Sequence, residues 1–266
     1  KDSKFRKNLQ ELSLRNFNLT NKYSSGLIDT YRHELLAENL IIKKKCLKIL
    51  HVTNFNERHN GRLFYNTGKR INNGFIRLKH SVLEFSDRDI VSYYRSIKDI
   101  DGSKKLNNKL IEVISNYVPD LIVLGHADLI NYDTLVFIKN NYPKIKICQW
   151  FLDRMDSDWS KNLIRFKDKM NLMDANFCTT DPKTLKLSKV IPLHYMPNPV
   201  DKSFETLKNF NKNYLTNDVF FAMSHGVHRG VLKKGKFDER ENSILKLQSL
   251  IPNIKFDLYG MKNIQP

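Results

Sequence analysis

The chain has 266 residues, of which 41% are hydrophobic and 27% are charged, as in an ordinary globular protein with one large domain or two modest ones. No stretch approaches the roughly 18 to 20 consecutive apolar residues of a membrane-spanning helix, and the polar first residues lead us to expect no secretory signal. The net charge of +17 favours nucleic acid, an anionic membrane surface or a phosphorylated substrate as partner. A basic surface without a specific partner is the alternative.

The two ends and the cysteines add two expectations. The sequence begins with Lys1 and stops at Pro266, just after a predicted strand, so we expect a fragment at both ends. Cys46, Cys148 and Cys178 are widely spaced and show neither metal-ligand spacing nor an even disulfide framework. They are therefore predicted to be free thiols in a reducing compartment, and we expect a cytoplasmic location, either in solution or peripheral at the membrane.

Residues 1–45 are polar and are predicted to form a helical N-terminal extension or linker. From residue 46 onward, short apolar runs alternate with segments of helical periodicity. Strands are predicted at residues 47–53, 81–85, 121–125, 146–152, 175–179 and 190–196. Helices are predicted at residues 63–78, 103–117, 130–142 and 161–172, with a short one from Pro182. This alternation predicts a doubly wound parallel sheet, an α/β Rossmann-like N-terminal domain over residues 46–201.

A second, similar unit follows a polar linker at residues 202–217. Residues 218–266 are predicted to begin another Rossmann-like domain, with a strand at 219–223, a helix around 244–251 and a strand at 255–259. Glycines and cations crowd the loop after its first strand. A strand, a basic glycine loop and a helix N-terminus commonly hold a phosphate or diphosphate. The residues predicted to bind a diphosphate are Gly226, Arg229, Gly230, Lys234 and Lys236; an exposed basic turn is the alternative.

Six segments together resemble GT-B-fold glycosyltransferases, particularly the bacterial and phage members related to the CgeB-like group. They are the runs KILHVT from Lys48, PDLIVLGH from Pro119, QWFLD from Gln149, MPNPVD from Met196, residues 226–236, and FDLYG from Phe256. The resemblance covers about residues 46–266 and implies two Rossmann-like domains, with the second one truncated here. The segment of Pro197, Asn198 and Asp201 would then be the interdomain hinge.

The resemblance implies a reaction as well as a fold. A nucleotide-diphosphate sugar would be the co-substrate, bound mainly by the C-terminal domain. A glycan, lipid-linked or protein acceptor would bind mainly the N-terminal one. Neither a metal nor another cofactor is expected, because cations and a helix dipole can stabilise the departing diphosphate. Asp87-Arg88-Asp89 has the letters of a metal motif but is predicted to be a polar turn after the second strand.

Polar residues at the ends of the predicted strands are the catalytic candidates, because ligands bind at the carboxyl edge of an open α/β sheet. His126 is predicted to be either a base, a hydrogen-bonding partner of the acceptor or a packing residue, and Asp153 is the second candidate base. Trp150 either stacks on a sugar or packs in the core, and His51 is predicted to be a core histidine. The loop after the first strand offers further acceptor contacts, or is a plain solvent loop; its candidates are Asn56, Arg58, His59, Gly61 and Arg62.

Two other classes of function stay open. A non-catalytic α/β module could use its basic face to bind nucleic acid or an anionic glycan. A different Rossmann-type nucleotide enzyme is the other rival. The first strand, however, is followed by Asn54-Phe55-Asn56 and not by the Gly-x-Gly-x-x-Gly fingerprint of dinucleotide-binding proteins. Each of these hypotheses also allows peripheral contact of the protein with an anionic membrane surface.

Overall fold

The computed structural model describes residue 11 and residues 46–97, 99–155, 160–187, 192–207, 211–223, 227–228, 231–232 and 239–260. Its contacts divide the chain after residue 206, within the segment predicted as a linker. We describe the two sides separately, as the first unit, which ends at Thr206, and the second unit, which begins at Leu207.

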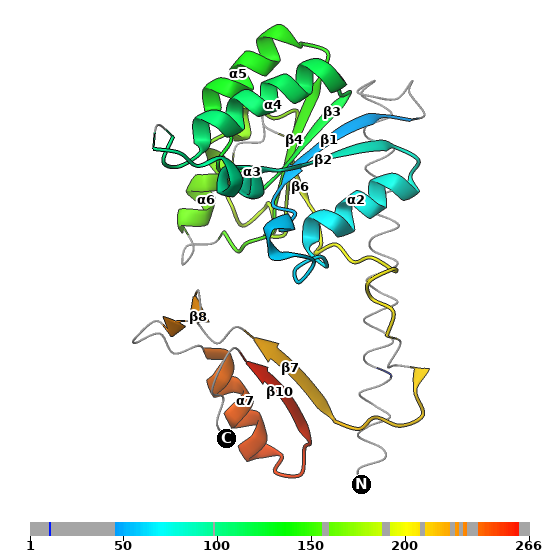
Figure 1. Ribbon diagram of the computed structural model, residues 1–266. Helices are drawn as coiled ribbons and strands as arrows, with labels where there is room; N and C mark the ends of the chain where they lie inside the picture. The colour runs from blue at the N-terminus through cyan, green and yellow to red at the C-terminus, as the bar shows by residue number, and fades with distance from the viewer. Residues whose placement is uncertain are drawn as a thin grey trace. The chain divides into compact units, whose positions relative to one another are not determined.

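The first unit contains a six-stranded, fully parallel sheet (Figure 1). Its strands are β1 (Lys48–Thr53), β2 (Ser81–Ser86), β3 (Leu121–Gly125), β4 (Lys146–Phe151), β5 (Ala175–Cys178) and β6 (Leu193–Tyr195). The spatial order is β2-β1-β3-β4-β5-β6. The predicted doubly wound, Rossmann-like α/β sheet is thereby confirmed.

Helices connect these strands. They are η1 (Glu57–His59), α2 (Thr67–Arg77), α3 (Asp87–Tyr94), α4 (Ser103–Tyr117), α5 (Tyr132–Asn141), α6 (Ser160–Lys167) and η3 (Met170–Leu172), where η denotes a 3-10 helix. α2 begins later than predicted because the Asn66 side chain caps it, accepting a hydrogen bond from the backbone N–H of Lys69 at 3.0 Å. The helix predicted at 161–172 is divided into α6 and η3.

Two local predictions were wrong. Asp87-Arg88-Asp89 is not a polar turn but the first turn of α3, where acidic side chains are favourable next to the helix N-terminus and where both carboxyl groups accept backbone N–H groups. The segment after Pro182 forms a turn and not a short helix. Thr184 N donates to Asp181 O at 3.0 Å and Leu185 N to Pro182 O at 3.3 Å, and the described residues there form a turn.

The sheet separates two apolar layers because alternate residues of a strand point to opposite faces. On one face, Leu50 and Val52 of β1 join the buried side chains of α3, α4 and α5. On the other face, Ile49 packs with Val123, Trp150 and partly buried side chains of α2. Helices thus cover both faces, and the polar loops are left at the ends of the strands.

The second unit contains a parallel pair of strands joined through a helix, as predicted. β7 (Val219–Met223) pairs with β10 (Phe256–Gly260), and α7 (Glu239–Leu250) connects them. Between β7 and α7 lies an antiparallel pair that was not predicted, β8 (Val227–His228) with β9 (Val231–Leu232). The predicted diphosphate-binding residues Gly226, Arg229, Gly230, Lys234 and Lys236 lie outside the described residues. Among the described helices, none combines the length and the hydropathy that crossing a membrane would require.

Candidate functional site

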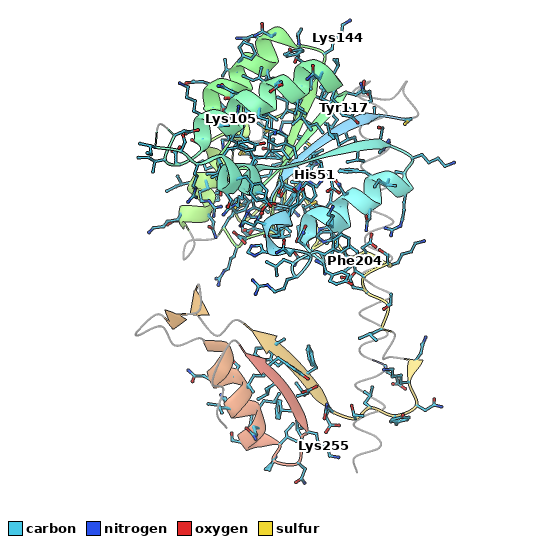
Figure 2. The ribbon with its side chains drawn as sticks, in the orientation of Figure 1. His51, Lys105, Tyr117, Lys144, Phe204 and Lys255 are labelled. Atoms are coloured by element: carbon cyan, nitrogen blue, oxygen red, sulfur yellow. The ribbon has the colours of Figure 1, made fainter. Side chains whose placement is uncertain are left out.

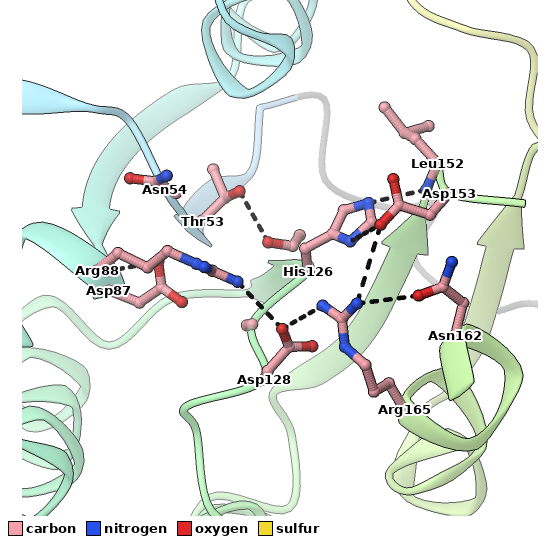
Figure 3. Close-up of polar contacts among 12 residues, drawn as sticks. Thr53, Asn54, Asp87, Arg88, His126, Asp128, Leu152, Asp153, Asn162 and Arg165 are labelled. Carbon is pink, nitrogen blue, oxygen red and sulfur yellow. Dashed lines mark hydrogen bonds and ion pairs between the residues drawn. The ribbon is translucent and has the colours of Figure 1, made fainter. Parts of the chain in front are cut away.

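The order of the strands creates a switch point between β1 and β3. The chain leaves β1 toward β2 on one side and later returns to β3 on the other side. At such a point the loops diverge and ligands bind beyond the carboxyl ends of the strands. We therefore take the residues that follow β1, β2, β3 and β4 as the candidate site (Figure 3).

Gly125 lets the ring of Trp150 approach the backbone of β3 closely at this edge. A Cβ atom on Gly125 would lie 2.0 Å from Cζ2 of Trp150, its neighbour across β3 and β4. The Thr53 hydroxyl donates to the Gly125 carbonyl at 2.8 Å and joins the end of β1 to the end of β3. These contacts hold the ends of β1 and β3 rigidly at the switch point. Precise positioning of reacting groups requires such rigidity.

His126, directly after β3, has both ring nitrogens directed at neighbours. Its Nε2 accepts a hydrogen bond from the backbone N–H of Leu152 at 2.9 Å, and its Nδ1 lies 3.7 Å from Oδ2 of Asp153. In the neutral ring the proton therefore sits on Nδ1 and faces the carboxylate. Burial lowers the pKa of His126, against the opposing effect of Asp153. To act as a base at Nε2, the ring would have to give up its bond to Leu152.

Asp153, two residues after the end of β4, is the more accessible of the two catalytic candidates. Its side chain is 55% exposed, against 20% for His126. Besides His126, it has the guanidinium of Arg165 on α6 at 3.9 Å. Arg165 therefore brings a positive charge to the Asp153 carboxylate from another element of the first unit.

Two arginines converge on Asp128, two residues beyond His126 (Figure 3). Arg88 donates to its Oδ2 at 3.1 Å, and Arg165 pairs with the same oxygen. The buried ammonium group of Lys169 fixes the backbone of this loop, donating to the carbonyl oxygens of residues 127 and 128 at 3.0 and 3.2 Å. The network links β2, β3, β4 and α6 at one edge of the sheet.

Asp87 brings a buried carboxyl group to the same edge. Its Oδ1 accepts the backbone N–H of Arg88 at 2.7 Å. Its Oδ2 is buried without a hydrogen-bond partner, the one such side-chain atom within the described part of the chain. Burial raises the pKa of Asp87 to about 6. No group of three or more His, Cys, Asp or Glu side chains suited to a metal ion occurs among the described residues.

Asp89 holds the loop after β1 in place. It accepts the backbone N–H of Glu57 at 2.8 Å and the guanidinium of Arg58 at 2.7 Å. Arg58 therefore lies at this edge, and its contact with an acceptor stays a prediction. Asn56 adopts a left-handed conformation and accepts a hydrogen bond from Asn54 at 3.0 Å. The other predicted loop residues stay candidates: His59 is half-buried, Arg62 is exposed and Gly61 has a φ of +83° that favours glycine.

Of the two roles expected for Trp150, stacking on a sugar or packing in the core, its position fits packing in the core. Its side chain is only 5% exposed, and its indole N–H donates to Nε2 of His51 at 3.1 Å. The ring fills the space that Gly125 leaves open, which is why it points inward and not into the crevice. His51, labelled in Figure 2, is the predicted core histidine. It also bonds to Asn72, and burial lowers its pKa to about 4.

Exposed aromatic rings lie instead on the loop between η1 and α2. Phe64 and Tyr65 pack edge-to-face with Phe204, with ring centroids 5.0 to 5.7 Å apart. Phe64 is 46% and Tyr65 65% exposed. Asn66 rigidifies the loop, its amide donating to the carbonyl oxygens of Phe55 at 2.9 Å and of Leu63 at 3.0 Å. These rings could contact a sugar in the way that was expected of Trp150.

The segment that holds Asp201 is bound to α2 and does not form a free hinge. The buried Asp201 carboxylate pairs with Arg77 through both oxygens, one of them at 2.8 Å. Glu205 pairs with Arg70 at 2.8 Å. The hinge role of Asp201 is therefore corrected: its bidentate pair with Arg77, whose side chain is 38% exposed, anchors this residue to the first unit. The roles of Pro197 and Asn198 stay predictions.

Comparisons with known proteins identify no family. No protein-family model matches the sequence, and no curated protein matches it. Among solved structures, one similar chain is the UDP-GlcNAc 2-epimerase from Neisseria meningitidis, solved with bound UDP-GlcNAc. The two chains are 15% identical, the match covers 82% of this chain and 67% of the epimerase chain, and the TM-score is 0.44. Such a low similarity supports no statement about activity.

Sequence reasoning missed part of the site, for identifiable reasons. Asp87, Arg88 and Asp128 follow the ends of β2 and β3, so the rule that pointed to His126 applies to them equally. Arg165 carries no such signal, because only the packing of α6 brings it to Asp128 and Asp153.

Proposed function

We propose that the protein is a glycosyltransferase that moves a sugar from a nucleotide-diphosphate sugar to a hydroxyl group of a glycan, lipid-linked or protein acceptor. The observation that carries the proposal is the exposed carboxylate of Asp153 beside His126 and Arg165, at the carboxyl edge of a doubly wound sheet. An accessible carboxylate at that edge suits removal of a proton from a bound hydroxyl group.

In the proposed reaction, the hydroxyl oxygen of the acceptor attacks the anomeric carbon of the donor sugar. The Asp153 carboxylate takes the proton of that hydroxyl group in the same step. The bond from that carbon to the diphosphate oxygen breaks, and the electron pair leaves with the nucleotide diphosphate. His126 is a positioning residue here: Leu152 fixes its Nε2, so its Nδ1 proton faces Asp153 and orients the carboxylate. Arg165 restrains the same carboxylate from the other side.

Two parts of the proposal rest on the sequence. The basic glycine loop, with Arg229 at its centre, would bind the diphosphate and stabilise the charge that develops on it. No metal is required if these cations act in its place. The exposed rings of Phe64 and Tyr65 would contact the acceptor, because their fixed orientation offers an apolar surface beside the candidate site. A cytoplasmic location belongs to the same hypothesis.

Binding of the donor is tested by the thermal stability of the full-length protein with UDP, GDP and their sugars. A ligand at a hundred times its Kd stabilises the folded state by about 2.7 kcal/mol, which is an easily measured increase in Tm. We expect one diphosphate nucleotide to raise the Tm, and Arg229→Ala to abolish the increase. No increase with any nucleotide would count against the proposal.

Transfer is tested by release of the nucleotide in the presence of a panel of glycan and lipid-linked acceptors. Asp153→Asn should lower kcat by about 10²- to 10⁴-fold, the usual contribution of a general base, without abolishing the nucleotide-dependent increase in Tm. Asp133→Asn, at an exposed position of α5, is the matched control and should retain activity. An unchanged kcat in Asp153→Asn would refute the assignment of the base.

A second candidate function is a non-catalytic module that binds nucleic acid or an anionic glycan. The net charge of +17 favours it. Binding to a polyanion would weaken steeply with added salt, because counterions are released on association. Steep salt dependence together with no increase in Tm for any nucleotide sugar would favour this function over transfer.

A further inference from the structure

The connection between α3 and α4 exposes an unusual number of large apolar side chains. We call the described residues 93–97 and 99–102 the finger; Figure 1 shows it projecting beside the two helices. Ile97 is 96% and Ile100 80% exposed, and Tyr93 and Tyr94 are 59% and 44% exposed. Single exposed apolar residues are normal, but four within eight positions of the sequence mark an interaction site.

Hydrogen bonds hold the finger in a defined conformation. Ser96 and Asp99 exchange backbone hydrogen bonds at 3.2 and 3.1 Å, which forms a tight hairpin with Ile97 at its tip. The Asp99 carboxylate accepts the backbone N–H of Lys105 at 2.8 Å and so ties the hairpin to the first turn of α4. Gly102, with a φ of +68°, completes the return to α4. Ile97 is thus held in an exposed position.

Cations surround the base of the finger. Nζ of Lys109 lies 4.8 Å from the centre of the Tyr94 ring and 3.4 Å from its hydroxyl oxygen, and Nζ of Lys105 lies 5.9 Å from the ring centre. Figure 2 labels Lys105 on this side of the first unit. A shallow hollow of about 290 Å³ lies next to them. Its lining residues are Tyr94, Ser96, Asp99, Lys104, Lys105 and Asn108.

We propose that the finger inserts into the surface of an anionic lipid bilayer. Ile97 and Ile100 would enter the acyl boundary, where buried apolar area provides the binding energy. Tyr93 and Tyr94 would lie at the level of the headgroups, where amphipathic rings are favoured. Lys104 and its neighbours on α4 would attract the anionic headgroups. The proposal does not depend on the transferase activity.

A bilayer fits this surface better than a protein partner does. A stable protein interface buries roughly 1,200 to 2,000 Å² around a packed apolar centre. The finger instead offers a tight turn closed by the isolated bridge between Ser96 and Asp99, in which the side chain of Ile97 is almost fully exposed. The finger carries exposed isoleucines, two tyrosines and nearby lysines of α4. A membrane interface offers matching layers: acyl chains, the headgroup region and the negative surface charge.

Flotation of the 266-residue chain with lipid vesicles tests the proposal. The vesicles are phosphatidylcholine alone, or phosphatidylcholine and phosphatidylglycerol at about three to one, which gives the bilayer its negative surface potential. We expect binding to the anionic vesicles that weakens with added salt. The double variant Ile97→Ser with Ile100→Ser should bind at least about tenfold more weakly, as expected from the loss of two inserted side chains. Both positions are exposed, so the variant should fold normally.

Matched controls separate this site from a general effect of charge or hydrophobicity. Ile164→Ser removes an isoleucine that is 67% exposed on α6 and should leave vesicle binding unchanged. Lys104→Gln with Lys105→Gln should weaken binding by about fivefold per lysine. Lys161→Gln with Lys167→Gln, on α6, should weaken vesicle binding less than Lys104→Gln with Lys105→Gln does.

Three results would overturn the proposal. The first is no binding of the wild-type chain to anionic vesicles. The second is equal loss of binding in the finger variants and in their α6 controls. The third is self-association of the chain, measured by sedimentation velocity, that the double isoleucine variant abolishes while vesicle binding is unchanged; the finger would then be a protein interface.

Discussion

Replacing Asp87 with Asn tests whether the ionised form of this buried carboxyl group lowers the stability of the folded state. Burial raises the pKa of Asp87 from 3.8 to about 6, a shift of roughly two units. Each unit corresponds to about 1.4 kcal/mol, so the ionised group destabilises the folded state by about 3 kcal/mol. The buried oxygen without a hydrogen-bond partner is the structural reason for this cost.

The sign of the pH dependence follows from which state holds the proton. Between pH 3.8 and about 6, the folded protein keeps a proton on Asp87 that the unfolded chain has released. The stability from this group is therefore fully present below pH 3.8 and is lost as the pH rises through about 6. Asparagine does not ionise. The free energy of unfolding of Asp87→Asn, relative to wild type, should thus increase by about 2 kcal/mol from about pH 4 to about pH 7.5.

Urea unfolding at each pH measures this difference through the midpoint at constant m-value. Tryptophan fluorescence, to which the buried Trp150 contributes, follows the transition. The new amide group can cost about 1 to 3 kcal/mol at every pH if its N–H groups lack partners, so the test is the slope and not the absolute value. Asp89→Asn is the matched control. Burial opposes its ionisation, but hydrogen bonds from Ser86 and from the loop after β1 lower the pKa of Asp89 overall, so relative to wild type this variant loses stability only as the pH rises toward 3.8. From about pH 4 to about pH 7.5 its curve should therefore run parallel to that of wild type. Parallel curves for Asp87→Asn and wild type would refute the reasoning.

Three other substitutions test the frame of the site. Burial lowers the pKa of His51 to about 4 from 6.5, so its stability contribution is lost as the pH falls from 6.5 through 4. His51→Phe should remove that acid sensitivity in urea titrations, and should cost about 1 to 3 kcal/mol at pH 7 because the indole N–H of Trp150 loses its acceptor. Gly125→Ala should abolish soluble expression or sharply lower the Tm, because its Cβ would lie 2.0 Å from that indole ring; a normal Tm would show that the ring can move. Arg77→Met should lower the urea midpoint of the first unit, because it leaves the buried Asp201 carboxylate without its cation; no change would mean that water replaces the guanidinium.

Local sequence signals were sufficient for much of the fold. The apolar run at β3 begins after Pro119-Asp120 and ends at Gly125, and α4 has a regular apolar stripe, so both elements have the predicted bounds. α3 follows β2 without an intervening loop and buries only Val91 among its apolar side chains, so periodicity could not reveal it. Its first turn depends on tertiary contacts, since Asp89 bonds to the backbone of η1 some thirty positions earlier.

In the candidate site, too, some features follow from the local sequence and others depend on tertiary contacts. His126 and Asp153 were identifiable because each follows the end of a predicted strand, a position that the fold class alone marks as functional. The direction of the Trp150 ring was not identifiable from its own neighbourhood. It depends on the register that puts Gly125 next to Trp150, and on the acceptor that His51 offers from β1. A glycine ending an apolar strand is a signal that a large side chain from the adjacent strand occupies its space.

The anchoring of the 201–205 segment limits how the proposed enzyme could move. Arg77 and Asp201 are 124 positions apart in the sequence, so no local pattern could predict their ion pair. Together with the Arg70–Glu205 pair and the packing of Phe204 on Tyr65, it makes the start of the predicted linker part of the first unit. If transfer requires the domains to close around the donor, the backbone rotations should therefore occur after Glu205. Loss of the Arg77 pair would add freedom nearer Pro197 and would change kcat and KM together.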